Sequence, residues 1–145
     1  MELNRSQSEL VRVLARLAGY HLQQGSDFPV TGAQMDSAGK VGLCKPSGLD
    51  SSASLQHRIE VLLRAFRSAA DDGELVACAY CAPVTVTHPK SEEQGPCILV
   101  SCECDDGSAV DVFVPFTKNP ALNLGTPFFV ARDGQIFSPA PVEST

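Results

Sequence analysis

The chain has 145 residues, of which 43% are hydrophobic and 19% are charged, and its formal net charge is −6 at pH 7. A chain of this length can bury one ordinary hydrophobic core, and its composition is too apolar for intrinsic disorder. The acidic charge offers no attraction to a phosphate backbone, which argues against a nucleic-acid partner. No stretch approaches the roughly 20 apolar residues that cross a bilayer, so we also expect no membrane insertion.

Charged residues and cysteines indicate the compartment. Glu2, Arg5, Glu9 and Arg12 interrupt the N-terminal region, where a signal peptide needs a continuous apolar core. Without export the thiols stay reduced, and we expect them to be small buried hydrophobic groups rather than disulfides. We therefore predict an acidic cytoplasmic protein. The six cysteines, all but the first in strand-like runs, are Cys44, Cys78, Cys81, Cys97, Cys102 and Cys104.

Two helices are predicted in the first half of the chain. Ser6 to Glu9 has the spacing of a capping box, apolar residues follow at helical intervals, and Gly25 supplies a stop, which predicts a first helix over residues 7–24. Asp50, Ser51 and Ser52 are candidate caps for a second helix, whose apolar face runs from Leu55 to Ala70.

The segment between the two helices, residues 25–50, is rich in Gly, Ser, Asp and Pro and has only scattered apolar residues. This composition predicts a long loop or linker. Connections of that length are uncommon inside compact domains, so the segment is expected to be either a functional loop or partly disordered.

The second half of the chain predicts four or five strands. Their short connections favour an antiparallel meander, and the preceding helices indicate an α+β fold in which a helix layer packs on the sheet. We expect one domain over residues 1–145, with a frayed tail over residues 138–145. The predicted strands cover residues 74–87, 96–104, 108–117, 126–132 and 135–137.

The register of the second and third predicted strands follows from matching their faces. A three-residue loop over 105–107, with Gly107 left-handed, places apolar residues opposite one another. A tight turn near Gly134 is expected to form a separate hairpin that pairs Val130 with Phe137. The pairs on one face of the first hairpin are Ile98 with Val114, Val100 with Val112 and Cys102 with Val110, and on the other Leu99 with Phe113, Ser101 with Asp111 and Glu103 with Ala109.

Both faces of this sheet need a partner or solvent. We expect the second helix to cover the face with Ile98 and Val100. The opposite face, to which we assign Leu99, Phe113 and Ala79, is only half polar. We favour the first helix as its cover, because a long amphipathic helix must bury its apolar stripe. A second chain, or solvent, remains the alternative for this face.

No residue pattern supports catalysis or metal binding. Cys78 and Cys81 have the spacing of a redox or zinc motif, but residues three apart on a strand point to opposite faces. Gly39-Lys40 lacks the glycine and the hydroxyl residue of a phosphate-binding loop. We therefore predict no catalytic residue, no metal ligand and no cofactor.

Two functional hypotheses follow. The first is a small non-enzymatic protein-interaction module, such as an adaptor, an immunity-type inhibitor or a chaperone-like dimer, with a protein partner or a second copy bound at Leu99 and Phe113. The second is a small-molecule or thiol-dependent enzymatic site between the 25–50 segment and the sheet. It would use Cys44, whose pKa Lys45 could lower, or the aromatic residues Phe28 and Tyr80.

Overall fold

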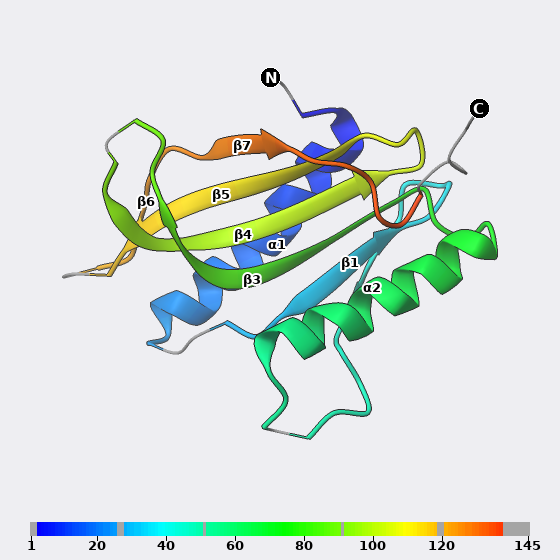
Figure 1. Cartoon of the computed structure of the whole chain (residues 1–145), viewed down its shortest axis with the longest axis horizontal. Helices are drawn as coiled ribbons and strands as arrows, with labels where there is room; N and C mark the ends of the chain where they lie inside the picture. The colour runs from blue at the N-terminus through cyan, green and yellow to red at the C-terminus, as the bar shows by residue number, and fades with distance from the viewer. Residues whose placement is uncertain (1–2, 26–27, 51, 91, 119–120, 138–145) are drawn as a thin grey trace.

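The computed structural model describes residues 3–25, 28–50, 52–90, 92–118 and 121–137. It has α+β content with one antiparallel sheet, as predicted, and neither helix of the described residues is long and apolar enough to cross a membrane (Figure 1). The sheet order is β2-β1-β3-β4-β5-β6, with β7 also paired to β5. The elements are α1 (Arg5–Gln23), β1 (Thr31–Met35), β2 (Val41–Cys44), α2 (Leu55–Asp71), β3 (Ala77–Thr87), β4 (Gln94–Cys104), β5 (Ala109–Thr117), β6 (Asn123–Leu124) and β7 (Phe128–Ala131).

Helix α1 begins two residues before its predicted start. Its N-cap is Asn4, whose Oδ1 accepts the Gln7 N–H at 2.8 Å, while Gln7 Oε1 accepts the Asn4 N–H at 3.0 Å. The capping box therefore uses Asn4 and Gln7 rather than Ser6 and Glu9. A tertiary contact selects this frame, because the buried Gln7 amide also donates to Ser108 Oγ at 3.3 Å.

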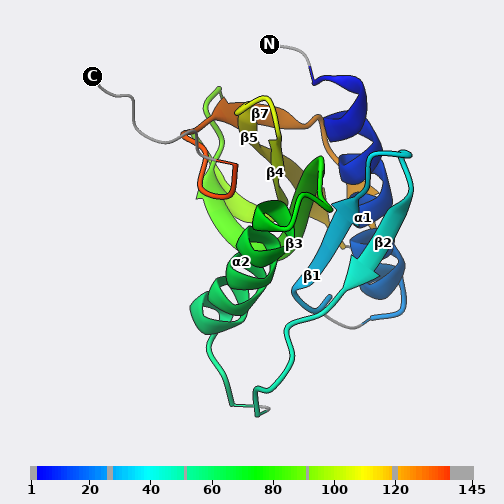
Figure 2. The ribbon, with the colours of Figure 1, turned by 90° about the vertical axis from the view of Figure 1, so that its right-hand side faces the viewer.

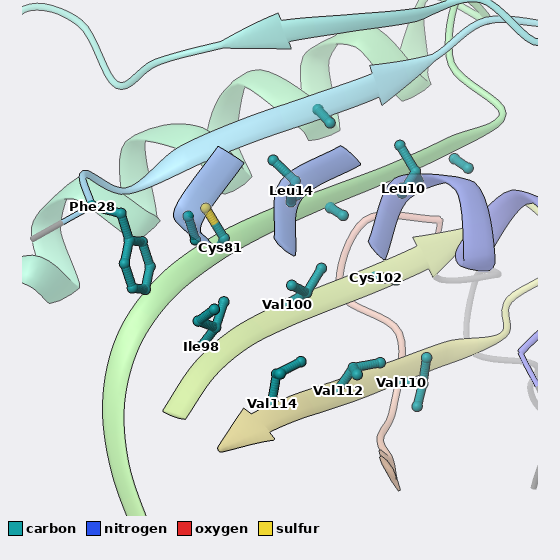
Figure 3. Close-up of a cluster of buried hydrophobic side chains, with 14 of the residues drawn as sticks. Leu10, Leu14, Phe28, Cys81, Ile98, Val100, Cys102, Val110, Val112 and Val114 are labelled. Carbon is teal, nitrogen blue, oxygen red and sulfur yellow. The ribbon is translucent and has the colours of Figure 1, made fainter. Parts of the chain in front are cut away.

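The two helices lie on opposite faces of the sheet, but each covers the face that we expected the other to cover (Figure 2). Helix α1, rather than α2, covers the face with Ile98 and Val100. Strand β3 explains the arrangement, because it is buried on both faces and each face needs a cover. Figure 3 shows the α1 side of the sheet, where Leu10 and Leu14 meet side chains of β3, β4 and β5: Cys81, Ile98, Val100, Cys102, Val110, Val112 and Val114.

Residues 25–50 are not one long loop, because they contain the antiparallel hairpin of β1 and β2. Strand β1 is almost entirely buried and pairs with β3 on its other side. The turn is closed by Asp36, whose Oδ1 accepts the N–H groups of Ala38 and Lys40. The sequence did not predict β1 because its small residues lack the alternation of a typical strand. Packing requires a small residue here, since a Cβ on Gly32 would lie 2.9 Å from the Phe66 ring.

The predicted register of β4 and β5 is confirmed at all six pairs, including Leu99 opposite Phe113. The loop that sets it has Gly107 at φ +89°, and the Gly107 N–H donates to the Cys104 carbonyl at 3.0 Å. The assignment of Ala79 to the Leu99 face is wrong, because Ala79 lies opposite Cys102 and is buried with α1.

The last predicted hairpin does not form. Strand β7 pairs with β5 and places Val130 opposite Asp111 rather than Phe137. Residues 135–137 are not a strand, because their backbone N–H groups bind the carboxylate of Glu103 on β4. The predicted frayed tail, residues 138–145, lies outside the described residues.

Substitution of Gly32 tests the packing of α2 on β1. Gly32→Ala should lower the free energy of unfolding by about 1–3 kcal/mol, because the new methyl group would overlap Cys44 Sγ and Phe66 Cζ, each 2.9 Å away. Gly42→Ala is the matched control on the neighbouring strand, where the added Cβ would have no atom within 4 Å apart from those of residues 41–43. Urea unfolding measures both. Equal stability of the two variants would contradict the packing described here.

Candidate functional site

Exposed apolar side chains gather along one side of the sheet. Among the described residues, six large hydrophobic side chains are exposed, and three of them lie on β6 and β7: Leu124 at 46%, Phe129 at 37% and Val130 at 50% exposure. The other three are dispersed over α1, β2 and α2. We call the four consecutive apolar residues Phe128 to Ala131 the β7 edge.

Among the described residues, the β7 edge pairs with β5 on one side of its backbone and with no strand on the other side. The Arg132 N–H donates to the Ala109 carbonyl at 3.2 Å, and the register continues with Val130 opposite Asp111. Because an antiparallel pair alternates inward and outward groups, the N–H and C=O of Phe129 and Ala131 point away from β5. Such groups are the template on which another strand can pair.

The opposite side of the sheet differs in chemistry. Strand β2 also has an exposed apolar residue, Leu43, but Lys40 and Lys45 flank the strand, and lysines at an edge discourage pairing. The β7 edge has no charged residue within it. Arg132 follows it directly, but that side chain is only 18% exposed and is bound inside the molecule.

Aromatic contacts hold one end of the β7 edge against the sheet. The rings of Phe128 and Phe113 stack with centroids 5.1 Å apart, and His88 meets Phe128 edge-on at 5.1 Å. The pairing places Leu99, Phe113 and Phe128 in one row across β4, β5 and β7. Leu99 and Phe113, both predicted binding residues, are therefore half-buried beside the β7 edge. A cavity of about 290 Å³ adjoins Phe128.

A charged network holds the other end. Arg132 Nε donates to Asp111 Oδ1 at 3.0 Å and to Ser101 Oγ at 3.1 Å, and Arg132 Nη1 donates to Glu103 Oε1 at 3.2 Å. Ser101 Oγ in turn donates to Asp111 Oδ1 at 2.6 Å. The guanidinium thus faces two carboxylates, which fixes the direction in which the chain leaves β7.

Glu103 is the buried centre of this network, with 1% exposure. Besides Arg132, its carboxylate accepts the N–H groups of Gln135 at 2.8 Å, Ile136 at 2.8 Å and Phe137 at 2.7 Å. We call residues 135–137 the C-terminal strap. Ile136 is buried against α2, so the C-terminal strap covers the sheet beside that helix, on the same face.

The structure separates the residues of the predicted small-molecule site. Phe28 and Lys45 line a cavity of about 320 Å³ with Arg58. Cys44 packs instead near Gly32, and burial raises the pKa of its thiol, opposite to the lowering by Lys45 that we considered. Tyr80 lies on another part of the sheet beside Ser101. Burial raises the pKa of Tyr80, against a smaller lowering by a hydrogen bond with Ser101.

Burial raises the pKa of all six cysteine thiols, which favours their protonated form. Burial raises the pKa of Cys81 to about 11 and that of Cys102 to about 12, and it also raises the pKa of Cys78. Thiols are weak nucleophiles and poor metal ligands in this form. Within the ranges described, no group of three or more His, Cys, Asp or Glu side chains is placed to hold a metal ion.

Sequence reasoning missed the residues that define this site. The sequence predicted a strand over Phe128, Val130 and Arg132, but paired it with residues 135–137 rather than with β5. The available signal was the run Phe128 to Ala131, four apolar residues without alternation, which is unusual for a strand with one solvated face.

Removing the centre of the network should destabilise the fold. Glu103→Gln should lower the free energy of unfolding by about 2–4 kcal/mol, because an amide NH₂ would face N–H donors and Arg132 would lose a buried partner. Asp133→Asn, an exposed neighbour, is the control. A Glu103→Gln, Arg132→Met double variant should lose less than the sum of its two single variants in urea unfolding. Strict additivity would show that the two side chains are not coupled.

The thiols should make the fold sensitive to alkali. An unfolded cysteine titrates near 9.0 and folded Cys81 near 11, so between these values the folded state binds more protons. The free energy of unfolding should therefore fall from about pH 9 to about pH 11, by about 1.4 kcal/mol per unit of pKa difference. Cys81→Ala should show a shallower fall in urea titrations over this range. Identical slopes would contradict the raised pKa.

The chain was compared with protein-family models, with curated proteins and with solved structures, and none of these comparisons gives a match.

Proposed function

We propose that this chain is a non-enzymatic protein-interaction module that binds an extended protein segment by adding a strand to the β7 edge. The observation that carries the proposal is the combination of outward backbone groups at Phe129 and Ala131 with exposed apolar side chains on the same short strand. In strand addition, main-chain hydrogen bonds supply affinity and the alternate side chains supply selectivity.

The side chains of the β7 edge define the segment that would fit. Phe128 and Val130 point to the α2 face of the sheet, and Phe129 points to the α1 face. Both faces of an added strand would therefore meet apolar neighbours. A suitable segment is extended, apolar at consecutive positions and without proline at the positions that must donate a hydrogen bond.

The anchoring of the β7 edge favours affinity. Phe128 is stacked on Phe113, and Arg132 is bound to Asp111 and Ser101, so both ends of the strand are held before a partner arrives. A pre-ordered strand loses little conformational entropy on binding, which leaves more of the interaction energy for affinity.

A small-molecule site remains the second candidate, at the cavity of about 320 Å³ lined by Phe28, Lys45 and Arg58. Basic side chains beside apolar walls would suit a small apolar carboxylate. We rank it second because the Arg58 guanidinium already donates to the carbonyls of Ala53 and Asp50.

Selection of peptides on the immobilised protein tests the proposal. A phage-displayed library of random ten-residue peptides would be selected on chains attached so sparsely that two copies cannot meet. We expect enrichment of apolar extended peptides. They should bind the Val130→Lys variant at least ten-fold more weakly than the wild type, because the substitution puts a charge beside the apolar added strand.

Leu43→Lys, on the β2 edge, is the matched control, since Leu43 and Val130 are similarly exposed at 54% and 50%. This variant should bind the selected peptides as the wild type does, and thermal melts should show both variants folded. Peptides that bind the Val130→Lys protein equally well, or a library that yields no binder, would overturn the proposal.

A further inference from the structure

We infer that the strand received by the β7 edge comes from a second copy of this chain, in an antiparallel pair about a two-fold axis at Val130. This inference rests on the proposed function and names its partner. Each β7 would extend the sheet of the other copy, so that two sheets become one continuous sheet.

The backbone selects this register. With the axis at Val130, Phe129 of each copy lies opposite Ala131 of the other, and these are the residues whose N–H and C=O point outward. Each such pair can exchange both of its hydrogen bonds. With the axis at Phe129 instead, Ala131 would face Pro127, which has no N–H to donate.

The side chains are self-complementary in the same register. A two-fold axis perpendicular to the sheet keeps the faces aligned, so Phe129 meets the small Ala131 on the α1 face while the two Val130 side chains meet on the α2 face. Large residues beside small ones, and β-branched residues beside each other, are favourable cross-strand pairs. An unrelated partner would need no such self-complementarity.

Charge does not oppose the pairing, although each chain carries a formal net charge of −6. No charged residue lies between Pro127 and Arg132, and the Arg132 guanidinium is bound to Asp111 and Glu103 of its own chain. The remaining repulsion is between distant charges, which physiological salt screens. Dimerisation should therefore strengthen modestly as the salt concentration rises.

The described residues that follow β7 do not cover its outer side. Figure 1 shows β7 as the outer strand beside β5, with the following residues turning back across the sheet. Those residues are the C-terminal strap, which Glu103 holds next to α2 and away from the outer side of β7. A contact made mainly by four residues on each side is small, so we expect a dissociation constant in the micromolar range or weaker.

Sedimentation equilibrium of the full chain from about 1 μM to about 1 mM tests the inference. The mass should rise with concentration from 15.4 kDa toward twice that value. Val130→Lys should weaken the dimer at least ten-fold, because it places two ammonium groups together on the axis. Leu43→Lys should leave the dissociation constant unchanged.

Cross-linking adds a geometric readout. Cysteines at position 130 would occupy a non-hydrogen-bonded pair, whose Cα atoms lie about 4.5 Å apart, within the range that a disulfide spans. Under mild oxidation Val130→Cys should give a covalent dimer, and the similarly exposed Leu43→Cys should not.

The outcomes separate this inference from the proposed function. A wild-type chain that stays monomeric to about 1 mM, or a dimer that persists in folded Val130→Lys, overturns the second-copy inference. If selected peptides still bind at β7 in that case, the proposed function stands with a foreign segment as the partner. If the dimer forms as described while no peptide binds, the proposed function is overturned and the β7 edge pairs only with its own sequence.

Discussion

The buried carboxylate of Glu103 is the interaction on which the C-terminal third of this structure depends. It gathers Arg132 and the N–H groups of residues 135–137 around one point on β4. A buried charge is tolerable only where a counter-ion and hydrogen bonds replace its hydration, and here both are present. The segment after β7 is thereby drawn across the sheet instead of continuing along its edge.

This arrangement also determines the chemistry of the sheet edge. An arginine next to an edge strand would ordinarily project into solvent and discourage pairing. Here the guanidinium of Arg132 turns inward to Asp111 and Glu103, so it does not place a charge at the outer side of the apolar run before it. The contacts of Arg132 with Asp111 and Glu103 therefore stabilise the fold and also leave the β7 edge apolar, as a partner strand requires.

The two faces of the sheet are covered unequally. Helix α1 packs along β1, β3 and β4, so its face forms a continuous core with the valines of β5. Helix α2 covers only the part over β1 and β3, and the remainder is divided between the C-terminal strap, the charged network and the Phe113–Phe128 stack. This face tolerates polar residues because their hydrogen bonds are made inside the molecule. Arg132 donates to Ser101, Glu103 and Asp111, and Ser101 donates to Asp111.

Features with local causes could be predicted from the amino-acid sequence. The amphipathic helices, the left-handed Gly107 and the β4–β5 register could be read from periodicity and turn chemistry, and with them the opposition of Leu99 and Phe113. Strand β1 could not be read, because its small residues are required by Phe66 and Leu62 of a helix that follows it in the chain. The face that each helix covers, the pairing of β7 with β5 and the site at its edge depend instead on tertiary contacts. In each case the contacts join residues that are distant in sequence, such as Glu103 and Ile136. Local periodicity and turn patterns carry no information about such contacts.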